Sequence, residues 1–264
     1  SHGGAIAMAA GSPSSDVAEL ARARGAPLLV GRGLLSWNGQ PPALALVDGD
    51  TGSVIFDPEP ETRRLFEQRM AAANAALAEA EAASLAPAHT ADGRRIAVLL
   101  NIAAPEDLAG LDPAICDGIG LVRTEFLFEA SGGLPDEDTK YAVYRRILEW
   151  AQGRPVTIRT LDAGGDKPIR GLTIDGESNP FLGLRGIRLS LARPEVFRVQ
   201  LRALSRAAVD GALKVMLPMI AVPAELDRAG VLLDAEFAAL RTEGIACARP
   251  PLGIMIEVPA AALC

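Results

Sequence analysis

The sequence predicts an α/β protein that contains part of a (β/α)8 barrel, with about five of the eight strands that such a barrel requires. From residue 97 onward, short apolar runs alternate with longer segments of helical periodicity. This order is typical of parallel strands joined by crossover helices. Charged residues follow several of the apolar runs directly, and the C-terminal ends of the strands are where such a barrel keeps its active site.

The expected strands are short and mostly apolar, and helical segments lie between them. The strands are Ala97–Ile102, Gly118–Val122, Val156–Ile158, Lys214–Met219 and Leu252–Ile256. The main helices are Asp136–Gln152, Pro194–Val209 and Pro223–Glu243. Because five strands cannot close the barrel, we expect an open, incomplete sheet.

The first 57 residues differ in composition from the rest of the chain, being rich in Gly, Ser and Pro. They are expected to form part of a separate domain. The expected elements are strands at Pro27–Gly31, Ala43–Val47 and Ser53–Phe56 and a helix at Asp16–Arg24. Glu61–Ala83 lacks Gly and Pro and is rich in strong helix formers, which predicts one long helix. We interpret residues 58–90 as a helical linker and residues 91–264 as the barrel part; a surface helix within one domain is the alternative.

The composition excludes several classes of protein. Apolar residues make up 49% of the 264 residues and the net charge is −7, which argues against a nucleic-acid partner. No apolar run reaches the roughly 18 residues of a membrane helix. Cys116, Cys247 and Cys264 have the spacing of neither a disulfide framework nor a zinc site, so a reducing cytoplasm is expected. The start without Met and the end at Cys264 lead us to expect a piece of a longer chain.

A set of cations near the expected strand ends predicts an anionic ligand. Its members are Arg123, Arg159, Lys167, Arg185 and Arg188. Guanidinium groups match phosphate and carboxylate oxygens bidentately. The glycine-rich segment from Asp162 to Lys167 adds backbone N–H groups that can cradle phosphate. The alternative is a group of solvated surface charges.

Glu257 follows the last expected strand and is a candidate ligand of Mg²⁺. Mg²⁺ is usually held by one or two carboxylates together with substrate phosphate and water. A plain salt bridge to one of the arginines is an equally good reading of this residue alone.

Five motifs resemble Enzyme I of the bacterial phosphoenolpyruvate-dependent sugar phosphotransferase system and occur in that family's order. They are GLVRTEFLF (120–128), RTLDAGGDK (159–167), NPFLGLRGIR (179–188), MLPMI (216–220) and GIMIEVPAA (253–261). Pyruvate phosphate dikinase and phosphoenolpyruvate synthase share the barrel, but usually have His at the position of Phe126. The resemblance therefore favours Enzyme I, with a dikinase or synthase relative as the alternative.

The resemblance implies a role for each matching residue. Arg123, Arg159 and Arg185 would hold the phosphate and carboxylate of phosphoenolpyruvate, with Arg188 supporting them. Lys167 would lie near the transferred phosphoryl group, and Glu257 would bind Mg²⁺. The phosphoryl group would pass to a histidine of a swivelling domain and then to an HPr-type phosphocarrier protein. A homodimer is also implied for the parent protein, and residues 1–57 would be the C-terminal part of the swivelling domain.

The phosphohistidine position departs from the family. Residues 11–22 resemble the family's Ser-His loop and the helix after it, but Asp16 stands where His is expected. Three readings remain open: a diverged copy that has lost transfer, a replaced residue, or an alignment in which Ser1-His2 is the active pair. The first reading admits a module that senses phosphoenolpyruvate without transferring phosphate. The family's second metal motif, Gly-Thr-Asn-Asp, and its catalytic Cys have no match in this sequence, so this piece is expected to be inactive alone.

Overall fold

A computed structural model describes the chain at residues 4–8, 17–18, 21, 25–31, 42–83, 86–131, 133–164, 169, 171–173, 179 and 182–263. The chain divides into two compact units, Ser1–Ala83 and Ser84–Cys264.

The first unit contains two small sheets and a long helix. β1 (Ile6–Met8) pairs in parallel with β2 (Leu28–Val30), and β3 (Ala45–Asp48) forms an antiparallel hairpin with β4 (Ser53–Phe56). The hairpin turn is stabilised by Asp48, whose Oδ1 accepts hydrogen bonds from the N–H groups of Asp50 and Thr51 at 3.0 and 3.1 Å. The strands predicted at β2, β3 and β4 are confirmed, whereas β1 was not predicted. Of the helix expected at Asp16–Arg24, residues 17, 18 and 21 are described, and all three are helical.

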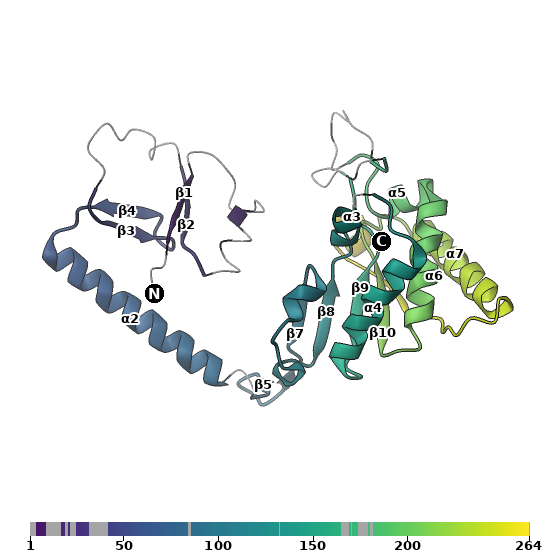
Figure 1. Cartoon of the computed structure of the whole chain (residues 1–264), viewed down its shortest axis with the longest axis horizontal. Coiled ribbons are helices and arrows are strands. Elements are labelled where there is room, and N and C mark those ends of the chain that lie inside the picture. The colour runs from purple at the N-terminus through teal and green to yellow at the C-terminus, as the bar shows by residue number, and fades with distance from the viewer. Residues whose placement is uncertain are drawn as a thin grey trace. The chain divides into compact units, whose positions relative to one another are not determined.

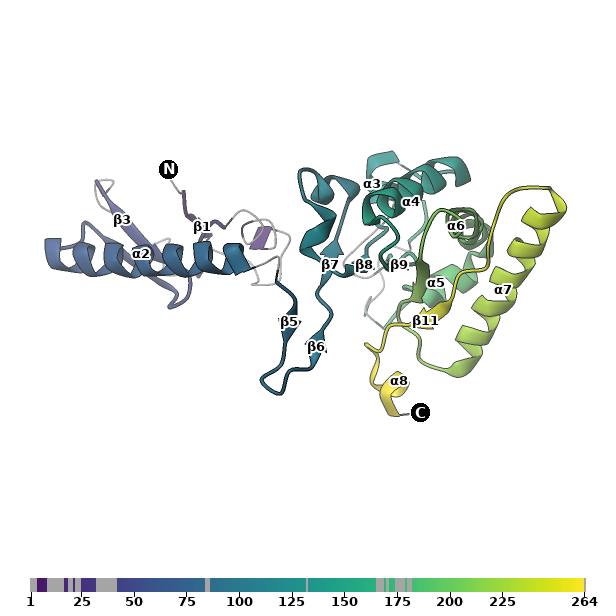
Figure 2. The ribbon, with the colours of Figure 1, turned by 90° about the horizontal axis from the view of Figure 1, so that it is seen from below.

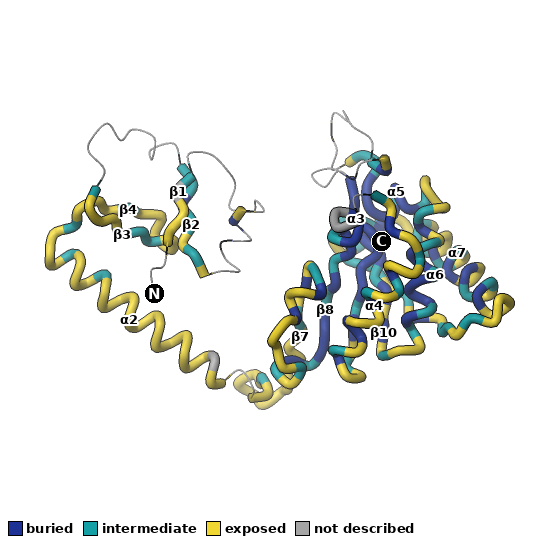
Figure 3. The backbone as a smooth tube through the Cα atoms, in the orientation of Figure 1, coloured by how far each residue is buried: buried dark blue, intermediate teal, exposed yellow. Residues whose placement is uncertain are grey.

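The long helix predicted from residue 61 is confirmed as α2 (Pro60–Ala83). It is exposed along nearly its whole length (Figure 3), including Leu65, Met70 and Leu77. Strong intrinsic helix propensity accounts for such a helix better than burial does. The division between the units falls after α2, and the role of residues 58–90 as a linker stays a prediction.

The second unit is built on an open five-stranded sheet (Figure 1) with the order β11-β10-β9-β8-β7. Its strands are β7 (Leu99–Ile102), β8 (Gly118–Val122), β9 (Val156–Arg159), β10 (Leu213–Leu217) and β11 (Leu252–Ile254). All four neighbouring pairs are parallel, and in the described residues β7 and β11 form the two edges. The predicted α/β class and partial barrel are therefore confirmed.

Three long helices pack beside one another over one face of this sheet (Figure 2): α4 (Glu137–Ala151), α6 (Pro194–Ala207) and α7 (Pro223–Thr242). Each begins and ends within two residues of its predicted bounds. The shorter elements were not predicted. They are η2 (Pro105–Leu108), η3 (Pro113–Ile115), α3 (Phe126–Ser131), α5 (Ile187–Ala192), α8 (Pro259–Leu263) and a hairpin of β5 (Ala88–His89) with β6 (Arg95–Ile96).

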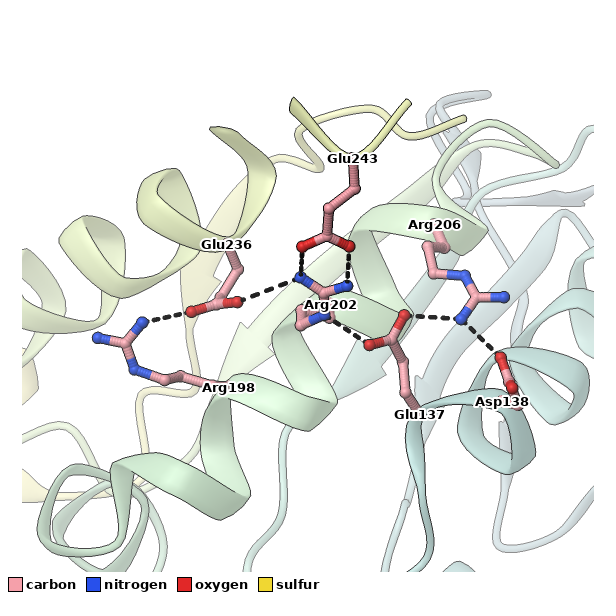
Figure 4. Close-up of polar contacts among 7 residues, drawn as sticks. All are labelled: Glu137, Asp138, Arg198, Arg202, Arg206, Glu236 and Glu243. Atoms are coloured by element: carbon pink, nitrogen blue, oxygen red, sulfur yellow. Dashed lines mark hydrogen bonds and ion pairs between the residues drawn. The ribbon is translucent and has the colours of Figure 1, made fainter. Parts of the chain in front are cut away.

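Ion pairs tie the three long helices together at their outer surface (Figure 4). Arg202 of α6 lies at the centre and binds Glu243 through two hydrogen bonds of 3.0 and 2.7 Å, while its Nε donates to Glu137 of α4 at 2.5 Å. Arg206, one turn further along α6, pairs with Glu137 and Asp138 at 2.6 and 2.7 Å. Hydrogen bonding to Arg202 lowers the pKa of Glu243. A network in which several charges share partners contributes more than isolated surface pairs do.

We expect residues 1–264, produced by themselves, to self-associate. Among the residues that the structure describes, one edge of strand β11 has no partner strand, and such an edge is a template for pairing with another chain. Large apolar side chains near it are exposed, including Ile256 at 66% and Leu263 at 86%. Sedimentation velocity should therefore show dimers or larger species, and Ile256→Lys should reduce them by placing a charge next to the edge. A monodisperse, cooperatively melting monomer of the unsubstituted chain would contradict this prediction.

The cysteines and the histidine that the structure describes occupy ordinary buried or surface positions. In the described part of the chain, Cys116 is a buried free thiol and Cys247 is half-buried, while Cys264 lies outside it. His89 is exposed in β5. None of the described helices is long and apolar enough to cross a membrane.

Candidate functional site

Two neighbouring strands deliver the central residues of the site. Arg159 is the last residue of β9, and Arg123 follows the end of β8 directly. Because the two strands are parallel, the segments 123–125 and 159–162 leave the sheet at the same edge. This is the C-terminal edge, where barrel enzymes carry their active sites.

Buried carboxylates hold two of the predicted cations. Asp162 pairs with both Arg159 and Arg185, each at 3.2 Å, and Arg185 binds it bidentately through Nε and Nη2. Glu125 pairs with Arg159 at 3.1 Å and also accepts the backbone N–H of Asp162 at 2.9 Å. All four residues are buried, at 2 to 9% exposure. The structure thus brings Arg159 and Arg185 together, as the sequence predicts, on one shared carboxylate.

These ion pairs change the net charge that the site presents to a ligand. Arg159 and Arg185 are balanced by Glu125 and Asp162, so the four residues carry no net charge together. The sequence analysis treated the two arginines as cations available to a ligand and did not predict their pairing with Glu125 and Asp162. The signal was present, because both carboxylates stand in the same strand-end motifs as the arginines. Within the described residues, Nε of Arg159 and Oε2 of Glu125 are buried without a hydrogen-bond partner. Unsatisfied buried groups of this kind are uncommon and often mark a functional site.

Two glycines allow the segment around Arg185 to approach the other strand ends. A Cβ on Gly164 would lie 2.8 Å from the carbonyl oxygen of Leu184, and Gly164 has a φ of +112°. A Cβ on Gly186 would lie 2.8 Å from Cγ of Met219 and 3.2 Å from Oδ1 of Asp162. A side chain at position 164 would therefore clash with the backbone of Leu184 and with Arg185, and one at position 186 would clash with Met219.

Arg188 and Arg123 occupy half-buried positions at the same edge. Arg188 lies in the first turn of α5, and its Nη1 donates to the carbonyl oxygen of Leu182 at 2.7 Å. The backbone N–H of Arg123 donates to the carbonyl oxygen of Ile102 at 3.0 Å, which continues the sheet beyond β8. Lys167, with Gly165 and Asp166 of its glycine-rich segment, and Asp16 lie outside the described residues.

Glu257 lies beyond the end of β11 and reaches the end of β10. Its Oε1 accepts the backbone N–H of Met219 at 2.7 Å. Met219 has a φ of +59°, a conformation that a non-glycine side chain adopts only under constraint. The same Met219 side chain faces Gly186, which precedes α5. Glu257 therefore belongs to the same edge of the sheet as Arg185, with Met219 between them.

The described residues contain no group of three or more His, Cys, Asp and Glu side chains that could hold a metal by themselves. A Mg²⁺ site built on one exposed carboxylate remains compatible with the usual chemistry of this ion, which keeps waters and takes phosphate oxygens from a substrate. Glu257 fits such a site because it is exposed and its hydrogen bond to the N–H of Met219 uses only one carboxylate oxygen.

A buried lysine next to the site gives a pH-dependent prediction. Lys140 is 1% exposed, donates a hydrogen bond to the carbonyl oxygen of Pro135 and lies 5.2 Å from the ring centre of Phe128. Burial lowers its pKa from 10.5 to about 8, and the nearby Asp136 opposes the shift only in part.

The unfolded chain therefore binds more protons than the folded protein between pH 8 and 10.5, and stability should rise with pH across that window. The gain should be on the order of 3 kcal/mol. Urea unfolding at several pH values should show this rise in the unsubstituted protein and lose it in Lys140→Gln. The exposed Lys214→Gln provides the control and should keep the rise. Identical pH profiles for Lys140→Gln and the unsubstituted protein would refute the prediction.

Comparison of the sequence with known proteins assigns the chain to a family. Residues 77–264 match the family described as PEP-utilising enzyme, PEP-binding domain. Phosphoenolpyruvate-protein phosphotransferases of Bacillus sp. (strain S), Priestia megaterium and Lactococcus lactis subsp. lactis (strain IL1403) are each 41% identical over 254, 256 and 256 residues. Each match covers 96% of this chain and 44% of the relative, so the chain spans less than half of these relatives' length. The chain belongs to the PEP-utilising enzymes, and the whole of its second unit lies within the matched PEP-binding domain.

Proposed function

We propose that this chain supplies the phosphoenolpyruvate-binding part of an enzyme that transfers a phosphoryl group from phosphoenolpyruvate to a protein histidine. The observation that carries the proposal is the pair of arginines on Asp162 at the C-terminal edge of the parallel sheet, in a domain whose family is described as PEP-binding. The relatives named as phosphoenolpyruvate-protein phosphotransferases support this reaction for the complete protein. Its proposed partner is an HPr-type phosphocarrier protein, and its proposed state is a homodimer in the cytoplasm.

In this proposal Arg123, Arg159 and Arg185 bind the phosphate and carboxylate oxygens of phosphoenolpyruvate. Arg159 and Arg185 are already ion-paired, so the carboxylates fix the orientation of the guanidinium groups before the ligand binds. Arg123 and Arg188 lie at the same edge of the sheet, and with the expected Lys167 they would add further cationic hydrogen-bond donors for the anion. Fixed donors of this kind stabilise the charge that develops as a phosphoryl group leaves.

Glu257 is the proposed Mg²⁺ ligand of this chain. The ion would supply positive charge to the phosphoryl oxygens when it is bound. The residues of the chain orient this ligand, because the N–H of Met219 holds one carboxylate oxygen of Glu257 in place.

Replacing Glu257 by glutamine separates a metal role from a structural one. The amide oxygen can still accept the N–H of Met219, so the local structure should be retained while the charge is lost. We expect the Mg²⁺ affinity, measured through phosphoenolpyruvate binding, to fall by about 100-fold or more, since loss of an outer-shell partner alone costs about 10- to 100-fold. Glu225→Gln is a matched control, because Glu225 also accepts a backbone N–H, at 2.7 Å, at the start of α7. Equal Mg²⁺ dependence of the two variants would remove Glu257 from the metal site.

The proposed function is tested by incubating the complete gene product with labelled phosphoenolpyruvate and Mg²⁺, and by measuring binding and protein labelling separately. Binding is expected, and its absence would refute the proposal. Asp16 at the expected phosphohistidine position favours a second candidate, a protein that binds phosphoenolpyruvate without transferring phosphate. Because Asp16 is itself expected to prevent labelling, protein labelling is measured in the Asp16→His form. Label in that form would support phosphoryl transfer, and binding without label in that form would favour the second candidate. A dikinase or synthase relative would in addition use ATP, and Phe126 argues against it.

A further inference from the structure

Gln200 is a buried amide beneath the candidate site. It lies in the middle of α6, is 2% exposed, and shares its side of the helix with the buried apolar residues Phe197 and Leu204. A buried amide needs hydrogen-bond partners, because desolvation without them is costly. Its partners therefore indicate why a polar side chain occupies this position.

The amide of Gln200 makes three hydrogen bonds, to the segment after β8, the segment after β9 and helix α4. Its Oε1 accepts the backbone N–H of Leu161 at 3.1 Å. Its Nε2 donates to Oγ1 of Thr124 and to the hydroxyl of Tyr144, each at 3.2 Å. The orientation follows from chemistry, since the N–H of Leu161 can only donate and needs the amide oxygen. All the partners' side chains are buried.

Two of these partners, Thr124 and Leu161, lie inside the two segments that carry the proposed ligand residues. Thr124 lies between Arg123 and Glu125, and Leu161 lies between Arg159 and Asp162. A single side chain from the helix layer thus joins the segments that follow β8 and β9.

The three hydrogen bonds of Gln200, called the bridge below, lie beyond the last backbone pairing between β8 and β9. The register between β8 and β9 ends at the pair Val122–Ile158. Beyond it, the described links between the two segments are made by side chains: Oγ1 of Thr124 donates to the carbonyl oxygen of Arg159 at 3.1 Å, and Glu125 binds Arg159 and the N–H of Asp162. Gln200 completes this set and ties it to α6 and α4.

We propose that Gln200 is a positioning residue for phosphoenolpyruvate binding, a role that rests on the proposed function. It sets the spacing between the segments of Arg123 and Arg159, so that guanidinium groups from two strands can bind the same anion. Its own burial beneath the strand ends keeps it from touching the ligand. Supporting residues of this kind hold binding groups to within about 0.5 Å of the productive geometry.

The test uses the complete gene product and three variants. Gln200→Leu keeps the approximate volume and removes all three hydrogen bonds. Gln200→Glu, when protonated, keeps an acceptor and one donor. Leu204→Val is the matched control, since it perturbs the same helix and the same core without touching the bridge. We expect phosphoenolpyruvate affinity to fall at least about tenfold in Gln200→Leu, since misplacement by about 1 Å can cost about 100-fold. The loss should be smaller in Gln200→Glu and less than about twofold in Leu204→Val.

Repeating the Gln200→Leu substitution in a protein that lacks Arg123 distinguishes a positioning role of Gln200 from a general loss of stability. If Gln200 acts through the spacing of the two arginines, Gln200→Leu should cause little further loss of affinity in an Arg123→Met protein. Equal affinity losses with and without Arg123, or equal losses in Gln200→Leu and Leu204→Val, would overturn the proposal.

Amide hydrogen exchange provides a readout that needs no ligand. Exchange at Leu161 and Asp162 should accelerate in Gln200→Leu and not in Leu204→Val, because only the first variant frees the N–H of Leu161. Unchanged exchange would overturn the proposal. Absence of phosphoenolpyruvate binding by the unsubstituted protein would refute the proposed function instead, and faster exchange in that case would show that the bridge serves the fold alone.

Discussion

Replacing Asp162 by asparagine is expected to destabilise the folded protein by roughly 3–5 kcal/mol, the range found when one partner of a buried ion pair is removed. Asp162 is 2% exposed and is the shared partner of Arg159 and Arg185. Without its charge, Arg185 loses a bidentate partner, and Glu125 is the carboxylate that remains paired with Arg159 among the described residues. Buried guanidinium groups cannot escape this cost by losing a proton.

Asp234→Asn is the matched control for the Asp162 variant. Asp234 also pairs with an arginine, Arg249, but both side chains are about half exposed, at 58 and 41%. An exposed pair of this kind contributes about 0–1 kcal/mol. Urea unfolding of the complete gene product should therefore separate the two variants by several kilocalories per mole. Similar losses of stability would mean that solvent reaches the buried cluster.

A compensating change identifies the source of the cost. If the penalty of Asp162→Asn comes from unpaired positive charge, adding Arg185→Met should recover part of the stability, because it removes one of the two cations. The double variant should still lose phosphoenolpyruvate affinity, since Arg185 is a proposed ligand residue. A further loss of stability in the double variant would instead indicate that Arg185 contributes mainly by packing.

The main strands and helices were predictable from local pattern because each has a strong signal. The apolar run Gly118–Val122 gave the bounds of β8 correctly, and α4 begins directly after Asp136, whose side chain accepts the N–H of Thr139 at 2.8 Å. The missed elements are short. β1 has three residues and β5 has two, too few for any periodicity to stand out.

The site was predictable in position but not in electrostatic state. Strand-end motifs located Arg159 and Arg185, yet the pairing of Arg185 with Asp162 joins residues 23 positions apart in the sequence. Gln200 had no signal at all, because a glutamine in the middle of an amphipathic helix is ordinary until its partners on other elements are known. Long-range contacts between separate elements, rather than local propensity, determine both features.

Asp16→His should convert a protein that accepts no stable phosphoryl group into one that does, if the sequence alignment of residues 11–22 is right. The proposed reaction needs a neutral imidazole nitrogen as nucleophile, and histidine with a pKa near roughly 6.5 provides it at neutral pH. A carboxylate is a possible acceptor, as in aspartyl-phosphate enzymes. It is shorter than imidazole, however, and it brings a negative charge towards an anionic donor.

The size of this repulsion supports an all-or-none result. Two unit charges about 4 Å apart at an effective dielectric constant of roughly 20 interact by roughly 4 kcal/mol. The arginines at the strand ends offset part of it, but the neutral cluster of Arg159, Arg185, Glu125 and Asp162 leaves less free positive charge than the arginines alone suggest. We therefore expect labelling from phosphoenolpyruvate only in the Asp16→His form of the complete gene product, with Mg²⁺ present.

Two further proteins make the labelling experiment decisive. Asp16→Asn removes the charge without supplying a nucleophile and should remain unlabelled, which separates relief of repulsion from a gain of nucleophilicity. His2→Gln tests the alternative alignment, in which Ser1-His2 is the active pair. Label in Asp16→His should be acid-labile and base-stable, as a phosphohistidine is, and should persist when His2→Gln is added. Label in the unsubstituted protein that disappears in His2→Gln would show that the alignment is wrong, and label that stays on Asp16 would show that the carboxylate is a competent acceptor after all.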